Sequence, residues 1–145
     1  MYGTEIGLEA YATARGVTLE GSPSVLLTQS HDYIESLDYK GTQVSFNAKW
    51  PRTGVKVNGF DIDGSTVPDA IINAEYAQAI AIDLGYGAQA AIEPSAKREK
   101  LDVMEVEYQD GASSNAIDVT TMAILRPYLS TSGAYGLSQC AVRKA

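Results

Sequence analysis

The segment from Thr66 to Leu84 constrains the fold most, because it is apolar on almost every side of a helical projection. Pro68 and Asp69 suit a first helical turn, and Gly85 suits the residue after a helix end. A helix that is hydrophobic all round is normally buried rather than spread on a surface. Its many alanines allow close approach by neighbouring helices. The sequence therefore predicts a central, buried helix over 66–84.

Three further segments carry helix signals. The first covers residues 4–15, where Thr4 is a suitable N-cap, and the second covers 22–37, with Pro23 in its first turn. The last covers 117–129. Since a chain of 145 residues can bury its own core, no disulfide or metal is needed to stabilise it. We expect a mainly α protein, a small bundle of about four helices.

Residues 39–66 differ in character from these helices. Glycines and Pro51 interrupt the segment, which also holds Trp50 (the only tryptophan) and both phenylalanines. We expect a long irregular loop, with a short hairpin around residues 55–60 that turns at Asn58-Gly59. Long loops inside a compact domain are usually functional or mobile. Trp50 either anchors a contact with a partner or fills the core of its own chain, and the sequence leaves both open.

Residues 100–108 alternate between apolar and charged side chains, which predicts an extended strand with one exposed face. No other strand of that length is evident, so a neighbouring subunit could supply its partner. The last residues, 130–145, are rich in Ser and Gly and include the basic residues Arg143 and Lys144. We expect one helical domain over 1–129, with the long loop and the strand, and an extended C-terminal tail over 130–145.

Charge and motif content exclude several classes of function. The net charge is −7, with 18 acidic and 11 basic residues, which disfavours avid binding to nucleic acid. His31 is the only histidine and Cys140 the only cysteine, and neither stands in a catalytic or metal-binding motif. No apolar run is long enough to span a bilayer, and no signal peptide is evident. We expect no enzyme activity, no cofactor and no metal or membrane site.

Several pieces of the sequence together resemble the head–tail connector (adaptor, or head-completion) proteins of long-tailed bacteriophages. More closely, the chain is similar to the phage family usually labelled DnaT-like single-stranded-DNA-binding protein. The resemblance extends from about Tyr2 to Leu129, and its pieces keep their order and spacing. The pieces are YGTEIGLEAYATARG, LLTQSHDYIES, WPRTG, VPDAIINAEYAQA, KREKLDVMEVEYQDG and LRPYLS.

This resemblance implies a structural virion protein at the head–tail junction, made in the host cytoplasm. Its subunits would form a homo-oligomeric ring of twelve copies between the portal protein and a neck or tail-completion protein, with DNA passing non-specifically through the lumen. The alternative that the family label implies is a single-stranded-DNA-binding replication accessory protein. Residues expected at interfaces are Phe46, Trp50, Pro51, Arg52, Leu101, Val103, Val106, Tyr108, Tyr135, Leu137, Val142 and Arg143.

Overall fold

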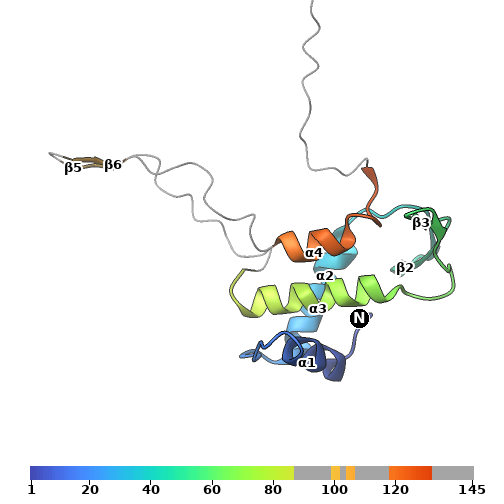
Figure 1. Ribbon diagram of the computed structural model, residues 1–145, viewed down its shortest axis with the longest axis horizontal. Coiled ribbons are helices and arrows are strands. Elements are labelled where there is room, and N and C mark those ends of the chain that lie inside the picture. The colour runs from blue at the N-terminus through green and yellow to red at the C-terminus, as the bar shows by residue number, and fades with distance from the viewer. Residues whose placement is uncertain (87–98, 102–103, 107–117, 132–145) are drawn as a thin grey trace, which may run out of the picture.

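Helix α3 (Asp69–Asp83) runs through the centre of the fold, with α1 (Glu5–Thr13) on one side and α4 (Asp118–Leu125) on the other (Figure 1). Helix α2 (Pro23–Ser36) packs against α3 and crosses it in Figure 1. The structure, a computed structural model, describes residues 1–86, 99–101, 104–106 and 118–131. Most of α3 is buried, which confirms the predicted central helix.

The helix ends follow the local chemistry that the sequence indicates. The Thr4 side chain accepts a hydrogen bond from the Gly7 amide at 3.1 Å and so caps α1. Pro23 occupies the first turn of α2. Gly85 ends α3 with a φ of 81°, a left-handed conformation that costs a glycine little. Helix α4 ends at Leu125, four residues before the predicted end at 129.

The expectation of a mainly α bundle is wrong, because the described residues form a mixed α/β structure with three small antiparallel sheets of two strands each. Residues 39–66 are two hairpins rather than an irregular loop. The glycines that suggested a loop stand at or beside turns. The strands have only two to six residues, which is too short to show clear alternation of apolar and polar side chains. The strands are β1 (Thr42–Ser45), β2 (Ala48–Thr53), β3 (Lys56–Val57), β4 (Phe60–Asp61), β5 (Glu99–Leu101) and β6 (Met104–Val106).

The two hairpins in 39–66 have tight turns. Ser45 pairs with Ala48, which leaves Phe46 and Asn47 as the connecting loop between β1 and β2. In the second hairpin, β3 pairs with β4, and Asn58 and Gly59 at the turn both have positive φ values, of 51° and 85°. Positive φ at both central positions characterises the type I′ hairpin turn. The predicted hairpin at Asn58-Gly59 is therefore confirmed.

A third hairpin replaces the single strand predicted over 100–108. Strand β5 pairs antiparallel with β6, so that Glu99 lies opposite Val106 and Leu101 opposite Met104. The strand partner thus comes from the same segment, and no neighbouring subunit is needed to supply it. The alternating pattern changes phase at Met104 because the chain has reversed direction there.

Two groups of buried side chains hold the fold together. Leu8 of α1, Leu27 of α2 and Ala79 of α3 belong to the first and are completely buried. The second lies beneath the hairpins and is centred on Trp50. The chain after α4 closes this second group through an antiparallel bridge between Tyr39 and Leu129.

Candidate functional site

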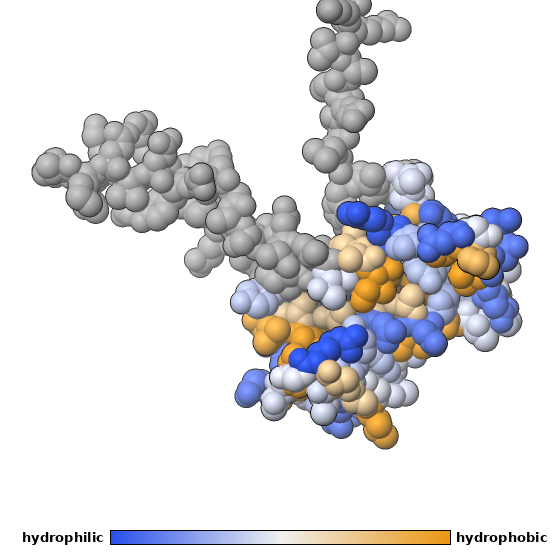
Figure 2. Space-filling model, in the orientation of Figure 1, coloured by the Kyte–Doolittle hydropathy of each residue, from blue (hydrophilic) through white to orange (hydrophobic). Residues whose placement is uncertain are grey.

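The hairpin lobe, which we define as residues 39–66, carries the most exposed aromatic side chains of the described structure. It contains β1 to β4 and lies beside the N-terminal end of α3 (Figure 1). Phe46, in the β1–β2 turn, is 99% exposed, and Phe60, next to the β3–β4 turn, is 77% exposed. At this end of the molecule, apolar side chains lie among hydrophilic ones (Figure 2). Exposed phenylalanines at two turns stabilise no core, so they are candidates for contact with a ligand.

The hairpin lobe also differs in charge from the rest of the chain. It contains four basic residues and two acidic ones, although the whole chain has a net charge of −7. The helical segments 1–38 and 67–86 contain one basic residue and nine acidic residues. The negative charge is therefore concentrated outside the lobe. The basic residues of the lobe are Lys40, Lys49, Arg52 and Lys56, and its acidic residues are Asp61 and Asp63.

Two lysines of the lobe are in long ion pairs near the surface, with side chains that are 68% exposed for Lys56 and 32% exposed for Lys49. Lys56 Nζ lies 3.5 Å from a carboxylate oxygen of Asp61, and both side chains are largely exposed. Lys49 Nζ lies 3.9 Å from Asp38. Exposed pairs of this kind contribute about 0–1 kcal/mol to stability. An anionic ligand could therefore displace either carboxylate at little cost.

The Arg52 side chain lies in the interior of the lobe rather than on its surface. Its side chain is 9% exposed and donates hydrogen bonds to four backbone carbonyls. The shortest of these bonds reach the oxygens of Lys40 and Gly41, each at 2.7 Å. Arg52 thereby fixes the chain entering β1 against β2, and its charge is not available to a ligand without disrupting the lobe.

Trp50 anchors the lobe to the helices. Its side chain is 1% exposed and packs edge-on against Tyr39 and Tyr128, with ring centroids 5.4 and 5.8 Å apart. Aromatic pairs prefer this edge-to-face arrangement. Of the two roles the sequence leaves open for Trp50, the structure supports filling the core of its own chain.

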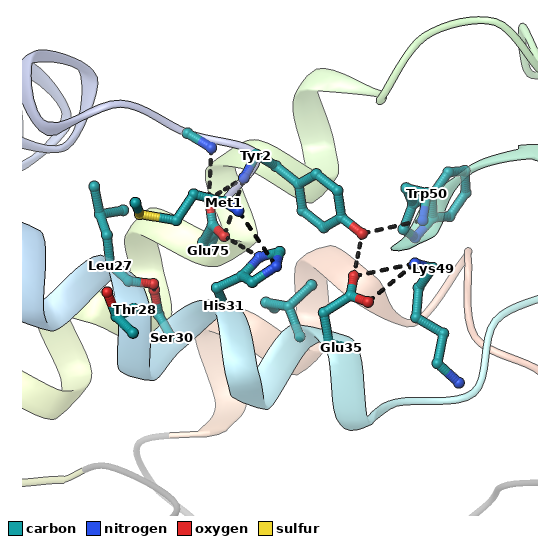
Figure 3. Close-up of polar contacts among 12 residues, drawn as sticks. Met1, Tyr2, Leu27, Thr28, Ser30, His31, Glu35, Lys49, Trp50 and Glu75 are labelled. Atoms are coloured by element: carbon teal, nitrogen blue, oxygen red, sulfur yellow. Dashed lines mark hydrogen bonds and ion pairs between the residues drawn. The ribbon is translucent and has the colours of Figure 1, made fainter. Parts of the chain in front are cut away.

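A polar network connects the N-terminal residues, α2, α3 and β2 (Figure 3). The fully buried carboxylate of Glu75 accepts hydrogen bonds from the Tyr2 and Gly3 amides and contacts His31 Nδ1 at 2.9 Å. Three groups thus contact one buried acid, and such partners offset the cost of burying a carboxylate. His31 is committed to this structural network.

The tyrosine hydroxyls near the network remain protonated. Burial, with the neighbouring carboxylate of Glu35, raises the pKa of Tyr2 above its usual value, and burial raises that of Tyr39. The Tyr2 hydroxyl can therefore donate to Glu35 at any physiological pH.

At the exit from the lobe, hydrogen bonds from Ser65 lower the pKa of Asp63. Its ionised carboxylate orders the turn that leads into α3.

The structure describes six of the twelve predicted interface residues. Of the four in the lobe, Phe46 is exposed, Pro51 is partly buried, and Trp50 and Arg52 are buried. Leu101 and Val106 lie in β5 and β6, where only the backbone is described. The remaining six are outside the described residues, namely Val103, Tyr108, Tyr135, Leu137, Val142 and Arg143. The sequence prediction did not include Phe60, which is exposed and stands beside the predicted Asn58-Gly59 turn.

The described residues offer no arrangement for metal binding. No group of three or more His, Cys, Asp or Glu side chains within 1–86 and 118–131 is placed to hold an ion. In the same part of the chain, no helix has the length and apolar character needed to cross a bilayer.

The described residues form a small mixed α/β fold, and its hairpin lobe carries two exposed phenylalanines. A family model described as "Putative DnaT-like ssDNA binding protein" matches residues 2–144, which is almost the whole chain. The chain therefore belongs to this DnaT-like family. No curated protein and no solved structure matches the chain.

Proposed function

We propose that the protein binds single-stranded DNA through the hairpin lobe and has no enzyme activity. The observation that carries the proposal is the exposure of Phe46 and Phe60 at two turns of the only described segment with an excess of basic residues. Membership of the DnaT-like family supports the same function.

The two kinds of side chain have separate roles in this proposal. Unpaired bases stack on exposed aromatic rings with little dependence on sequence, because every base has a π-face. Lys49 and Lys56 are placed to contact phosphates, for which they would leave Asp38 and Asp61. The net charge of −7 does not prevent this, because binding depends on the local field at the lobe and most acids lie elsewhere. The bases of a duplex are already stacked and would not reach the phenylalanines.

The proposal can be tested by titrating the full chain into a labelled deoxythymidine oligonucleotide at several salt concentrations. If Lys49 and Lys56 each neutralise one phosphate, the slope of log K against log salt should be about −1.4, since each contact on a single strand contributes about −0.7. A duplex of the same length should bind more weakly. Absence of binding to the single strand at low salt would refute the proposal.

Replacing Asp61 with asparagine should strengthen binding to the single strand. The substitution removes the negative charge 3.5 Å from Lys56 Nζ and leaves a side chain of the same shape. At this separation in water the charge contributes about 1 kcal/mol, so affinity should rise by up to about fivefold at low salt. Fluorescence anisotropy measures the change. Glu9→Gln, which removes an exposed acid from α1, is the matched control and should have little effect.

A second candidate function is that of a connector subunit at the head–tail junction of a bacteriophage. The observation that favours it is also in the lobe, because Phe46 in an exposed hairpin turn could insert into a neighbouring subunit. In this proposal the subunits form a twelve-fold ring, contact the portal and a neck or tail-completion protein, and let DNA pass through the lumen. The acidic helical part would discourage DNA from adhering to the ring.

The connector proposal requires the protein to be part of the particle. Quantitative mass spectrometry of intact virions should find it in a ring-multiple copy number, and light scattering should detect association with the portal protein. Finding the protein only in the cytoplasm of infected cells would exclude this second function and leave the first unaffected.

A further inference from the structure

Tyr2 connects the helices to the hairpin lobe through its main chain and its side chain (Figure 3). Its amide donates to Glu75 of α3 at 3.1 Å, and the next amide, that of Gly3, donates to the same carboxylate at 2.6 Å. At the other end of the side chain, the Tyr2 hydroxyl accepts a hydrogen bond from the Trp50 amide of β2 at 3.0 Å and donates to Glu35 of α2. One residue thus contacts three elements.

Glu35 extends this contact along β2. Its carboxylate accepts the amide of Lys49 at 3.0 Å, so the network takes up two successive backbone donors of β2. These donors are not satisfied by β1, whose partners in β2 are Ala48, Arg52 and Thr53. Tyr2 and Glu35 therefore attach β2 to the N-terminal residues and to α2.

The position of Tyr2 is itself closely fixed by the helices. Glu75 is completely buried and holds the main chain of residues 2 and 3. A Cβ atom at Gly3 would lie only 2.2 Å from Cε1 of Tyr76, so the chain passes α3 at a distance that only glycine permits. Hydrogen bonds in a low-dielectric interior are strengthened and well defined in direction. The hydroxyl of Tyr2 is thus presented to β2 from a rigid support.

From these contacts we infer that Tyr2 is the positioning residue of the hairpin lobe. Its hydroxyl, together with Glu35, sets the orientation of the β1–β2 hairpin, and hence of Phe46, relative to the helices. The effect of Tyr2 on DNA binding rests on the proposed function, whereas its effect on the geometry of β2 does not.

The test is the Tyr2→Phe variant, which removes the hydroxyl but keeps the ring that packs edge-on against His31 at 4.9 Å. Amide hydrogen exchange followed by NMR should accelerate at Lys49 and Trp50 by about twofold to tenfold, the range expected for loss of one hydrogen bond. Amides of α3 should exchange as in the unaltered chain. Unchanged exchange at both β2 amides would refute the inference. Tyr11→Phe, which alters a tyrosine of α1 outside this network, is the matched control.

DNA binding provides the second readout. If Tyr2 positions Phe46, Tyr2→Phe should weaken binding to the single strand by about twofold to tenfold at unchanged salt slope, because no phosphate contact is lost. Faster exchange with unchanged affinity would show that Tyr2 does not position the binding surface. If the unaltered chain binds no DNA, the proposed function fails, and the exchange experiment still decides the role of Tyr2 in β2.

The Glu35→Gln variant tests whether Tyr2 and Glu35 act on β2 as one network or through two independent contacts. The amide oxygen of glutamine can still accept a hydrogen bond from the Lys49 amide. Hydrogen exchange at the Lys49 and Trp50 amides should therefore accelerate less than in Tyr2→Phe. In the double variant, the effects on Trp50 exchange should be smaller than the product of the single effects, since both substitutions break the same hydroxyl–carboxylate contact. Strictly multiplicative effects would contradict the linked action of Tyr2 and Glu35.

Discussion

Replacing Phe46 with alanine should weaken binding to single-stranded DNA by about 5-fold to 150-fold, the effect of losing about 1–3 kcal/mol of base–aromatic stacking. Phe46 is 99% exposed, so the substitution should leave the free energy of unfolding within about 0.5 kcal/mol of its original value. Fluorescence anisotropy measures the affinity and urea unfolding the stability. A large loss of affinity without loss of stability would identify Phe46 as part of the binding surface.

Ile6→Ala is the control for this experiment. Ile6 is 80% exposed on α1 and outside the lobe, so its replacement removes a comparable exposed apolar side chain without touching the proposed surface. It should not change the affinity. Phe60→Ala, alone and combined with Phe46→Ala, then shows whether both turns contact one strand of DNA. If neither phenylalanine affects binding, the lobe is not the DNA-binding surface.

Trp50→Ala should have the largest effect on stability, a loss of about 3–5 kcal/mol in the free energy of unfolding. Trp50 has the largest fully buried side chain described, and its removal leaves a cavity between Tyr39 and Tyr128. Urea unfolding followed by circular dichroism measures the loss, because the variant has no tryptophan fluorescence. A loss below about 1 kcal/mol would contradict the placement of Trp50 as the anchor of the lobe.

Trp50→Phe is the informative companion variant. The indole Nε1 has no hydrogen-bond partner among the described residues, so phenylalanine removes a buried donor without leaving an acceptor unpaired. The ring can still pack between the two tyrosines. We therefore expect a smaller loss of stability than for alanine, with DNA binding retained.

The helices could be predicted from the sequence because their signals are local. Each signal acts within one or two turns of the residues that carry it. These signals are the apolar residues on all sides of α3, the Thr4 cap of α1 and Pro23 in the first turn of α2. The β1–β2 hairpin could not be predicted in this way. Its strands are short, Pro51 lies inside β2, and its arrangement depends on Arg52 reaching four carbonyls and on Trp50 entering the core. Such contacts are tertiary and leave no periodic pattern.

The candidate site could be predicted only in part for the same reason. Phe46 was identified from its residue type, but Trp50 and Arg52 were grouped with it although the fold turns them inward. The net charge of −7 gave no sign of the basic lobe, because it averages the lobe with the acidic helical segments. Glu35 and Glu75 gave no sequence signal, since their role depends on Tyr2 being brought beside them from a distant position.

The bridge between Tyr39 and Leu129 has a consequence for how the chain folds during synthesis. It joins residues about 90 positions apart, and the Lys40 and Ser130 amides reinforce it through bonds to Tyr128 and Asp38. Contacts so distant in sequence form slowly, because a long loop must close first. During synthesis, residues 39–66 leave the ribosome well before residues 118–131, which pack against them. Until residues 118–131 emerge, the part of the core around Trp50 that Leu125 and Tyr128 cover stays exposed, and a chaperone that binds apolar segments could bind there.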